Sequence, residues 1–496
     1  MRWLLCLLSV SAQILQYDRI PVPDSYRFRN TGKFFSFSPQ DNNAKWLEWF
    51  GLEAKPPIVV YDQIHLDTES RAQWGNYPGL HIQLVPLNVY EDVIAPVMDQ
   101  GLDSSFCCTI ADVTSGVCKH AGYVMYPQNR DLNYGYKISP MSPPERVAGA
   151  IARQAVFQTL IINCHTKTAP GYISGNVILR GPYGYISAVE LPKLLLYGVS
   201  AAGFLLLLLA WAGQMTRYRK QVTRIHQLFL AVILISLLES LFWSAHFHYW
   251  NNLGYISVPL NVLAVGFTVI RISSLLILML VLGMGWGVTK HRLDRGTKVR
   301  VRFLWFLIVC AEVGRQWISE VHYTRDISDI VAVLAALPSA LLYAVTIVWT
   351  LLSLGTLLGQ LRRTQQTAKY SHFSRFACVL GTSGVFMLCV IGLQYWVILF
   401  LSLEKRWTYE WFFTAGCDQI LHFFVLSMTA FIWRPTRLSK QLQFAVQLTD
   451  LTDAPRPKNI YEDMKLQLQE EARLDDEDEL DRILDSEEVT AERRVV

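Results

Sequence analysis

Charged side chains interrupt several of the long apolar stretches in this sequence. Arg271 lies near the middle of the run FTVIRISSLLILML, and Glu239 lies inside the apolar stretch that precedes it. A charged group at the centre of a membrane span costs at least ~2.5 kcal/mol by insertion scales, so such groups normally face a partner or a wet cavity. We therefore expect both side chains to have a specific role.

The depths of the two residues predict an ion pair between them. If consecutive spans run in opposite directions, Arg271 lies ~20 Å into its span and Glu239 ~18 Å into the preceding one, at ~1.5 Å per residue. Both then lie close to the midplane of a ~30 Å hydrocarbon core. Consecutive elements are usually neighbours, so we expect the two to meet. The pair either only locks two helices together or forms part of a binding site.

Four further polar residues lie inside apolar stretches. Glu312 and Arg315 are three residues apart and share one helical face, and Asp418 and His422 are four apart on another. Together with the central pair, they predict a polar intramembrane cavity for a lipid head group, an acyl-linked cargo or an ion. Asp418 and His422 make only half of a metal site, so no metal is expected. The sequence has no HExxH, GxSxG or P-loop motif, and we expect neither catalytic residues nor a cofactor.

The composition indicates a membrane protein. The chain has 496 residues, of which 52% are hydrophobic and 17% charged, and its mean hydropathy is +0.24. Seven apolar stretches are each long enough to span a bilayer. They lie near Leu191–Gln214, Gln227–Phe247, Val258–Trp286, Phe303–Ile318, Ile327–Leu357, Phe376–Leu401 and Trp411–Trp433. The fourth is the weakest, because Glu312 and Arg315 interrupt it.

Loop charges predict the orientation of these spans. The first, third and fifth connections and the segment after the last span are rich in lysine and arginine, which favours the cytosolic side. Arg2, an apolar run and Val10-Ser11-Ala12 have the form of a signal peptide, although an uncleaved anchor or a buried strand is the alternative. We predict a signal peptide at residues 1–12, a lumenal domain at 13–188, a seven-helix domain at 189–435 and a cytosolic tail at 436–496. Since the basic clusters abut the spans, no nucleic-acid partner is expected.

The predicted lumenal domain is rich in short β-type runs separated by Gly, Pro, Asn and Asp. These runs begin near Lys33, Pro57, Leu80, Gly122, Val156 and Gly171, and they predict an antiparallel β-sandwich. The run SPPERVAGAIARQA is expected to form a short helix between strands.

The lumenal domain also predicts two disulfides in an oxidising compartment. Its four cysteines are Cys107, Cys108, Cys118 and Cys164. A bond between the two adjacent cysteines would be strained, so each of them pairs with either Cys118 or Cys164. That leaves two connectivities open. Cys417, at the start of the last span, is either a buried thiol or a partner for a lumenal cysteine.

The polar tail carries two candidate sorting signals. Residues 470–488 contain eleven acidic residues against two arginines. The motif YEDM has the spacing Tyr461 to Met464 that clathrin adaptors bind, and ELDRIL, with Glu479, Ile483 and Leu484, has the form of an acidic dileucine signal. Both predict contact with clathrin-adaptor-type sorting machinery.

Three motifs lie at the boundaries of the predicted spans. VILRGPYGYISAVELPKLLLYG begins at Val177, LGMGWGVTKHRL at Leu282 and FIWRPT at Phe431. They resemble the entry into the first span and the ends of the third and seventh spans in the lung seven-transmembrane receptor family, also called GOLD-domain seven-transmembrane proteins. Ile186-Ser187 and Lys290-His291 depart from the family pattern, which indicates a divergent member.

The resemblance implies a GOLD-like β-sandwich on seven helices, residence in Golgi and endosomal membranes, and a role in protein transport. It also implies a structural likeness to Wntless, a carrier of lipidated proteins. We therefore expect a Golgi protein, cycling to endosomes or the plasma membrane, that binds a phospholipid or a lumenal protein or glycan cargo. A cation channel or channel regulator, and an orphan signalling receptor, are the two alternatives. The end of the third span lacks the Asp-Arg-Tyr motif of rhodopsin-like receptors.

Overall fold

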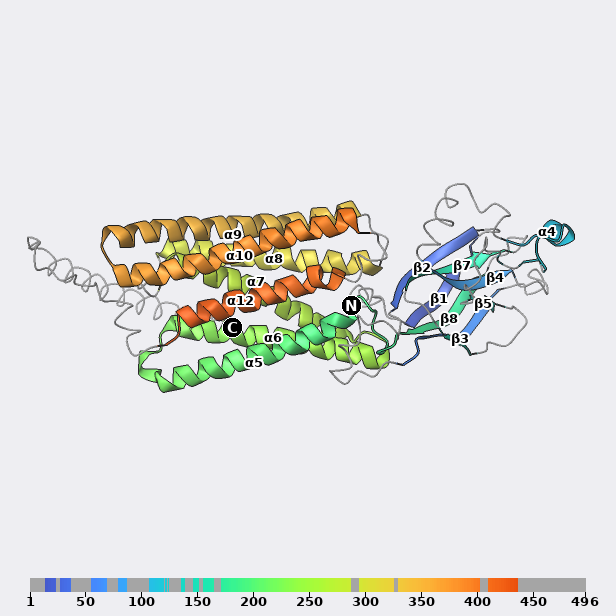
Figure 1. The fold of residues 1–496 in the computed structure, drawn as a ribbon, viewed down its shortest axis with the longest axis horizontal. Coiled ribbons are helices and arrows are strands. Elements are labelled where there is room, and N and C mark those ends of the chain that lie inside the picture. Colours follow the sequence, from blue (N-terminus) through green and yellow to red (C-terminus); the bar gives the residue numbers. More distant parts are fainter. Residues whose placement is uncertain are drawn as a thin grey trace, which may run out of the picture. The chain divides into compact units, whose positions relative to one another are not determined.

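The structure of the chain is a computed structural model (Figure 1). It describes residues 14–23, 27–36, 55–68, 79–86, 107–119, 121–122, 124, 135–138, 146–150, 155–164, 171–286, 294–324, 329–401 and 409–435. All strands that it describes precede Leu191, and all long helices follow it. The predicted order of a β-domain and a helical membrane domain is confirmed. The predicted signal peptide and tail lie outside the described residues.

The β-domain is a sandwich of two antiparallel four-stranded sheets. One sheet has the order β1 (Ile14–Pro21), β8 (Tyr172–Arg180), β3 (Ile58–Asp67) and β6 (Val147–Ala150). The other has the order β2 (Arg27–Ser36), β7 (Ala155–Asn163), β4 (Leu80–Pro86) and β5 (Gly135–Ile138). Residues of both sheets, such as Val177 and Phe157, are fully buried in one shared core. The predicted sandwich is therefore confirmed.

The strands follow the predicted runs in most places. β2, β3, β4, β7 and β8 each fall on a run of β-branched and aromatic residues. The run from Gly122 is described at Gly122 and Val124, and Val124 bridges to Cys107. β1 and β5 are two strands that the sequence patterns did not predict.

The short helix predicted between residues 142 and 155 is wrong in its described part. Val147–Ala150 forms strand β6, which pairs with the edge of β3, with Ala148 opposite Val60. The weak helix propensity of a segment that contains Gly149 is outweighed by the hydrogen bonds that β3 offers along its open edge.

Two disulfides join the loops of the β-domain. Cys107 is bonded to Cys164 and Cys108 to Cys118, so the structure selects one of the two predicted connectivities. The second bond encloses helix α4 (Ile110–Thr114). A capping box starts this helix: the Thr109 hydroxyl accepts from the Asp112 N–H at 3.2 Å, and the Asp112 carboxylate accepts from the Thr109 N–H at 2.9 Å. Cys417 is a buried free thiol.

Seven long helical segments make up the membrane domain, within the part of the chain that the structure describes. They are α5 (Leu191–Arg217), α6 (Arg224–Leu253), α7 (Val258–Gly283), α8 (Arg295–Thr324), α9 (Asp329–Arg363), α10 (Thr367–Phe400) and the π-helix η6 (Phe412–Gly416) continued by α12 (Cys417–Ile432). Each coincides with a predicted span. Six have the length and apolar composition of a membrane span, and α8 does not qualify. The charged residues of α8, among them Glu312 and Arg315, lower its hydropathy below that of the other six helices.

The long helices run alongside one another in a bundle (Figure 1). Helix α7 packs against α6, α8 and α9, and α12 packs against α10 and α5. Large apolar side chains on the outer faces are exposed, among them Leu206 on α5 and Leu388 on α10. In water such surfaces would be unfavourable, so they are the faces that contact lipid. The protein is a multi-pass membrane protein.

A tight turn connects the last strand to the first helix. Gly184 has φ +140°, in the region that favours glycine, and the Asn251 side chain of α6 packs against it. Asn251 donates from Nδ2 to the Tyr183 carbonyl at 3.0 Å and accepts at Oδ1 from the Ile186 N–H at 3.3 Å. This turn is part of the motif that resembles the family's entry into the first span.

We expect Gly184→Ala to destabilise the protein by about 2–3 kcal/mol, because the new Cβ strains the backbone and overlaps the Asn251 amide. Thermal unfolding of the purified protein measures the loss. Gly181→Ala is the matched control, since its Cβ would meet the Gly184 and Ile186 carbonyl oxygens at 3.5 and 3.8 Å, which are ordinary van der Waals contacts. An equal fall in melting temperature for both variants would contradict this role of Gly184.

Candidate functional site

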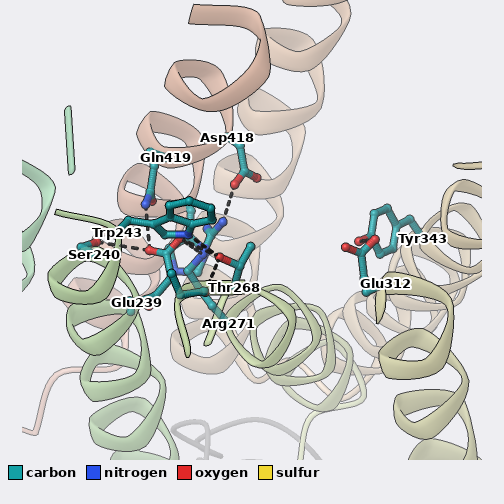
Figure 2. A network of polar contacts seen from close by, with 12 residues as sticks. Glu239, Ser240, Trp243, Thr268, Arg271, Glu312, Tyr343, Asp418 and Gln419 are labelled. Carbon is teal, nitrogen blue, oxygen red and sulfur yellow. Dashed lines mark hydrogen bonds and ion pairs between the residues drawn. The ribbon is translucent and has the colours of Figure 1, made fainter. Parts of the chain in front are cut away.

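Arg271 occupies the centre of a buried polar cluster between three helices. It lies on α7 with 1% of its surface exposed, and Glu239 lies on α6 with none exposed. The Arg271 Nε lies 3.5 Å from Glu239 Oε1, and the two side chains meet as Figure 2 shows. The ion pair predicted from the depths of the two residues is confirmed.

A second carboxylate completes the cluster. Arg271 Nη2 donates to Asp418 Oδ2, which belongs to α12 (Figure 2). The Asp418 side chain is 54% exposed, whereas its partner is buried. The π-helix η6 ends directly before Cys417 and Asp418, and such wider turns are frequent at functional sites. Two carboxylates and one guanidinium give this cluster one more negative than positive group.

Neutral polar side chains surround the Glu239 carboxylate. Gln419 Nε2 donates to Oε2 at 2.8 Å, Thr268 Oγ1 donates to Oε1 at 3.2 Å, and Ser240 Oγ donates to Oε2 at 3.3 Å. Trp243 Nε1 donates to Thr268 Oγ1 at 2.8 Å (Figure 2). The sequence patterns missed these residues. A signal was present, because Thr268 lies one helical turn before Arg271 and Gln419 follows Asp418.

Three buried polar atoms of the cluster have no hydrogen-bond partner in the described part of the chain. They are the donors Arg271 Nε and Nη1 and the acceptor Gln419 Oε1, and of the two donors Nε has the ion pair with Glu239. Buried polar groups in folded proteins are normally hydrogen-bonded to protein, water or a ligand. The cluster therefore has unused capacity to bind a group that carries acceptor oxygens.

Glu312 and Arg315 form a separate pair with a third partner. Arg315 Nη2 donates to Glu312 Oε2 at 2.8 Å, which confirms the predicted mutual neutralisation. The Tyr343 hydroxyl of α9 donates to Glu312 Oε1, a contact that the sequence patterns missed. Figure 2 shows Glu312 and Tyr343 apart from the Arg271 cluster.

His422 has a partner of its own on another helix. Its Nε2 lies 2.8 Å from Ser236 Oγ of α6, and its ring packs edge-on against Phe204 of α5 at 5.8 Å. His422 is buried, whereas the Asp418 side chain is exposed. The two residues therefore serve different contacts, although they are one turn apart. Their membership of a single cavity stays a prediction.

Two features remain: groups that could bind a metal ion, and the predicted sorting signals. Within the described residues, no group of three or more His, Cys, Asp or Glu side chains is arranged to hold a metal ion. The sorting signals at Tyr461 and Met464, and at Glu479, Ile483 and Leu484, lie outside the described residues.

A family model decides the class of membrane protein. Residues 192–440, half of the chain, match the model described as "GOST, seven transmembrane domain". The chain belongs to the GOST seven-transmembrane family. The match covers all the helices after the turn at Gly184, including those that carry Glu239, Arg271 and Asp418. Because the family domain has seven transmembrane segments, the match supports α8 as a spanning segment in addition to the six that qualify by length and composition. The resemblance to lung seven-transmembrane receptors is thereby confirmed.

The chain is also similar to several curated membrane proteins. The chain is 27% identical to transmembrane protein 87A of Xenopus tropicalis over 57% of its length and 51% of the relative's. It is 25% identical to transmembrane protein 87B of Homo sapiens over 64% and 57%, and 22% identical to membrane protein PTM1 of Saccharomyces cerevisiae over 55% and 53%. The chain spans about half the length of the curated relatives it matches.

Proposed function

We propose that this protein supports membrane trafficking in the Golgi and endosomes by binding a lipid, or a lipidated or lumenal cargo, at the Arg271 cluster. The β-domain lies in the lumen and the tail in the cytosol, as the loop charges favour. The function needs neither catalytic residues nor a cofactor. Partners are a membrane lipid, a lumenal protein or glycan, and clathrin-adaptor-type sorting machinery that binds the tail.

The exposure of Asp418 carries this proposal. Asp418 lies ~14 Å along the span that starts at Tyr409, at ~1.5 Å per residue, which is near the middle of a ~30 Å core. A half-exposed carboxylate at this depth requires a wet cavity or a polar ligand. The free donor of Arg271 supplies a partner for the phosphate or ester oxygens of a lipid. A lipid head group that carries an ammonium or hydroxyl donor for Asp418, besides oxygens that accept from Arg271, therefore satisfies both observations.

The test is purification of the full chain in mild detergent from native membranes, with bound lipids and proteins identified by mass spectrometry. We expect a lipid or lipidated protein at one copy per chain. Asp418→Leu should reduce its retention by at least about tenfold, since a charge-assisted contact contributes ~1.5–3 kcal/mol. Arg302→Gln is the control, because Arg302 is exposed on α8. Retention that is equal in both variants would contradict binding at the cluster.

The tail is tested separately. Removal of residues 446–496 should shift the protein from the Golgi to another membrane, as observed by fluorescence microscopy of the tagged chain. Tyr461→Ala and Leu484→Ala should each reproduce part of the shift. An unchanged distribution of the truncated chain would contradict a sorting role for the tail.

A cation channel is the second candidate, favoured by the negative excess of the Arg271 cluster. Two carboxylates and one guanidinium attract a cation, as do the acidic rings of cation channels. Current through the purified protein in planar bilayers tests it. A current that Asp418→Asn and Glu239→Gln both leave unchanged would contradict a channel that uses these residues.

A further inference from the structure

Basic side chains gather at one end of the helices, which we call the Trp433 end. Here α5, α9 and α12 end, and α6, α8 and α10 begin. The described cations of this end are Arg217, Arg219, Lys220, Arg224, Arg295, Lys298, Arg300, Arg302, Arg362, Arg363, Lys369, Arg375 and Arg434. Among the described residues of the same segments, Asp294 is the one carboxylate, and it accepts from the Gly296 N–H at 3.1 Å. Apart from Asp294, the described residues of these segments therefore offer the cations no carboxylate.

Lys369 differs from the other cations because it is buried. Only 6% of its surface is exposed, so most of its side chain packs inside the protein. Its ammonium is not one of the fully buried, unpartnered atoms, so it reaches the surface at the end of a buried stem. An anion at this surface would supply a counter-charge for it.

Lys369 lies on the turn of α10 that precedes its contacts with Trp433. His372 and Phe373 follow one turn later, and both rings contact the Trp433 ring, at 4.8 and 6.0 Å between centroids. Trp433 is 5% exposed, and its Nε1–H has no hydrogen-bond partner among the described residues. One buried donor without an acceptor therefore lies at the packing of α10 against α12, one helical turn from the Lys369 position.

Exposed cations surround Lys369 and the Trp433 indole. The Phe229 ring lies 6.4 Å from the Trp433 ring between centroids, which brings the start of α6, and with it Arg224, beside the end of α12. Arg375 lies one turn after His372 and interacts with it electrostatically. The Arg434 guanidinium lies 4.5 Å from the centroid of the Phe431 ring, which is exposed on the lipid-facing side of α12. A basic group over a lipid-facing ring is placed at the level of lipid head groups.

We propose that the Trp433 end of α6, α10 and α12 binds the phosphorylated head group of an anionic membrane lipid. Lys369 and the Trp433 indole N–H bind the phosphate oxygens, and Arg224, Arg375 and Arg434 supply the surrounding positive charge. The acyl chains lie along Phe431. A phosphate group suits this site because it accepts several charge-assisted hydrogen bonds at once. The inference is independent of the Arg271 cluster, which lies near the middle of the spans.

The test is native mass spectrometry of the purified full chain with added lipid. Phosphatidylinositol phosphate, phosphatidylserine and phosphatidylcholine are each titrated. We expect the phosphorylated inositol lipid to be retained at least about tenfold more than phosphatidylcholine, and Lys369→Met to weaken its retention by at least about tenfold. Methionine preserves the length and packing of the side chain, and thermal unfolding without added lipid should show no loss of stability.

Arg302→Gln is the matched control, since it removes one exposed cation at the same end but on α8. It should change retention by less than about twofold. Equal losses in Lys369→Met and Arg302→Gln would contradict a defined site and indicate diffuse attraction. Equal retention of phosphatidylserine would also overturn the proposal. So would binding that appears only after removal of residues 446–496, because the acidic tail would then be the occupant.

Discussion

Arg271→Gln should destabilise the protein by about 3–5 kcal/mol, because it leaves two carboxylates without their positive partner. The larger part of the lost stability comes from the Glu239 carboxylate. It is fully buried and would retain only the neutral donors Gln419, Thr268 and Ser240. Asp418 is half-exposed and regains water more easily. Thermal unfolding in a single detergent measures the loss as a fall in melting temperature.

A second substitution separates the ion pair from general packing. Arg271→Gln combined with Glu239→Gln removes the stranded charge and should recover most of the lost stability. Arg302→Gln should change stability by no more than ~0.5 kcal/mol, as expected for an exposed residue away from such features. A double variant as unstable as Arg271→Gln alone would show that the pair is not what stabilises this region.

Loss of the Cys107–Cys164 disulfide should have the second large effect. The bond closes a sequence separation of 57 residues, and loop-closure entropy alone then gives about 4 kcal/mol. The Cys108–Cys118 bond closes a separation of 10 residues, for which the same model gives about 2.7 kcal/mol. Cys107 also lies in the segment that bridges to Val124. We therefore expect the β-domain to depend more on the first bond.

Paired serine variants of each bond measure this difference. Cys107→Ser with Cys164→Ser should lower the melting temperature more than Cys108→Ser with Cys118→Ser. The second pair is the control, because it removes the same number of sulfur atoms from the neighbouring bond. If the melting temperature falls more for the Cys108–Cys118 double variant, loop length does not determine how much each disulfide stabilises this domain.

The helices were the most predictable part of the fold. Each predicted span coincides with an observed helix, because lipid demands a long, continuous apolar run and leaves no other spanning structure for such a chain. The ion pair of Glu239 and Arg271 was predictable for the same reason, since position along a span fixes depth. Neighbours in sequence are also neighbours in the bundle here, as α6 packs against α7.

The contact between Arg271 and Asp418 was not predictable from depth along a span. Asp418 is far from Arg271 in sequence, and only the packing of the last helix against the first three brings them together. Strand β6 was missed because the open edge of β3 determines its conformation, which local propensity does not show. The burial of Lys369 was not predictable either, since the sequence places it among the basic residues between two apolar stretches.

The most direct measurement of the central claim is a high-resolution cryo-electron microscopy map of the full chain in lipid nanodiscs. The claim is that the half-exposed Asp418 and the free donor of Arg271 mark a binding cavity. We predict elongated non-protein density that reaches Arg271 Nη1 and passes Asp418. A cluster sealed by protein side chains, with no such density and with Arg271 Nη1 bonded within the chain, would contradict the cavity.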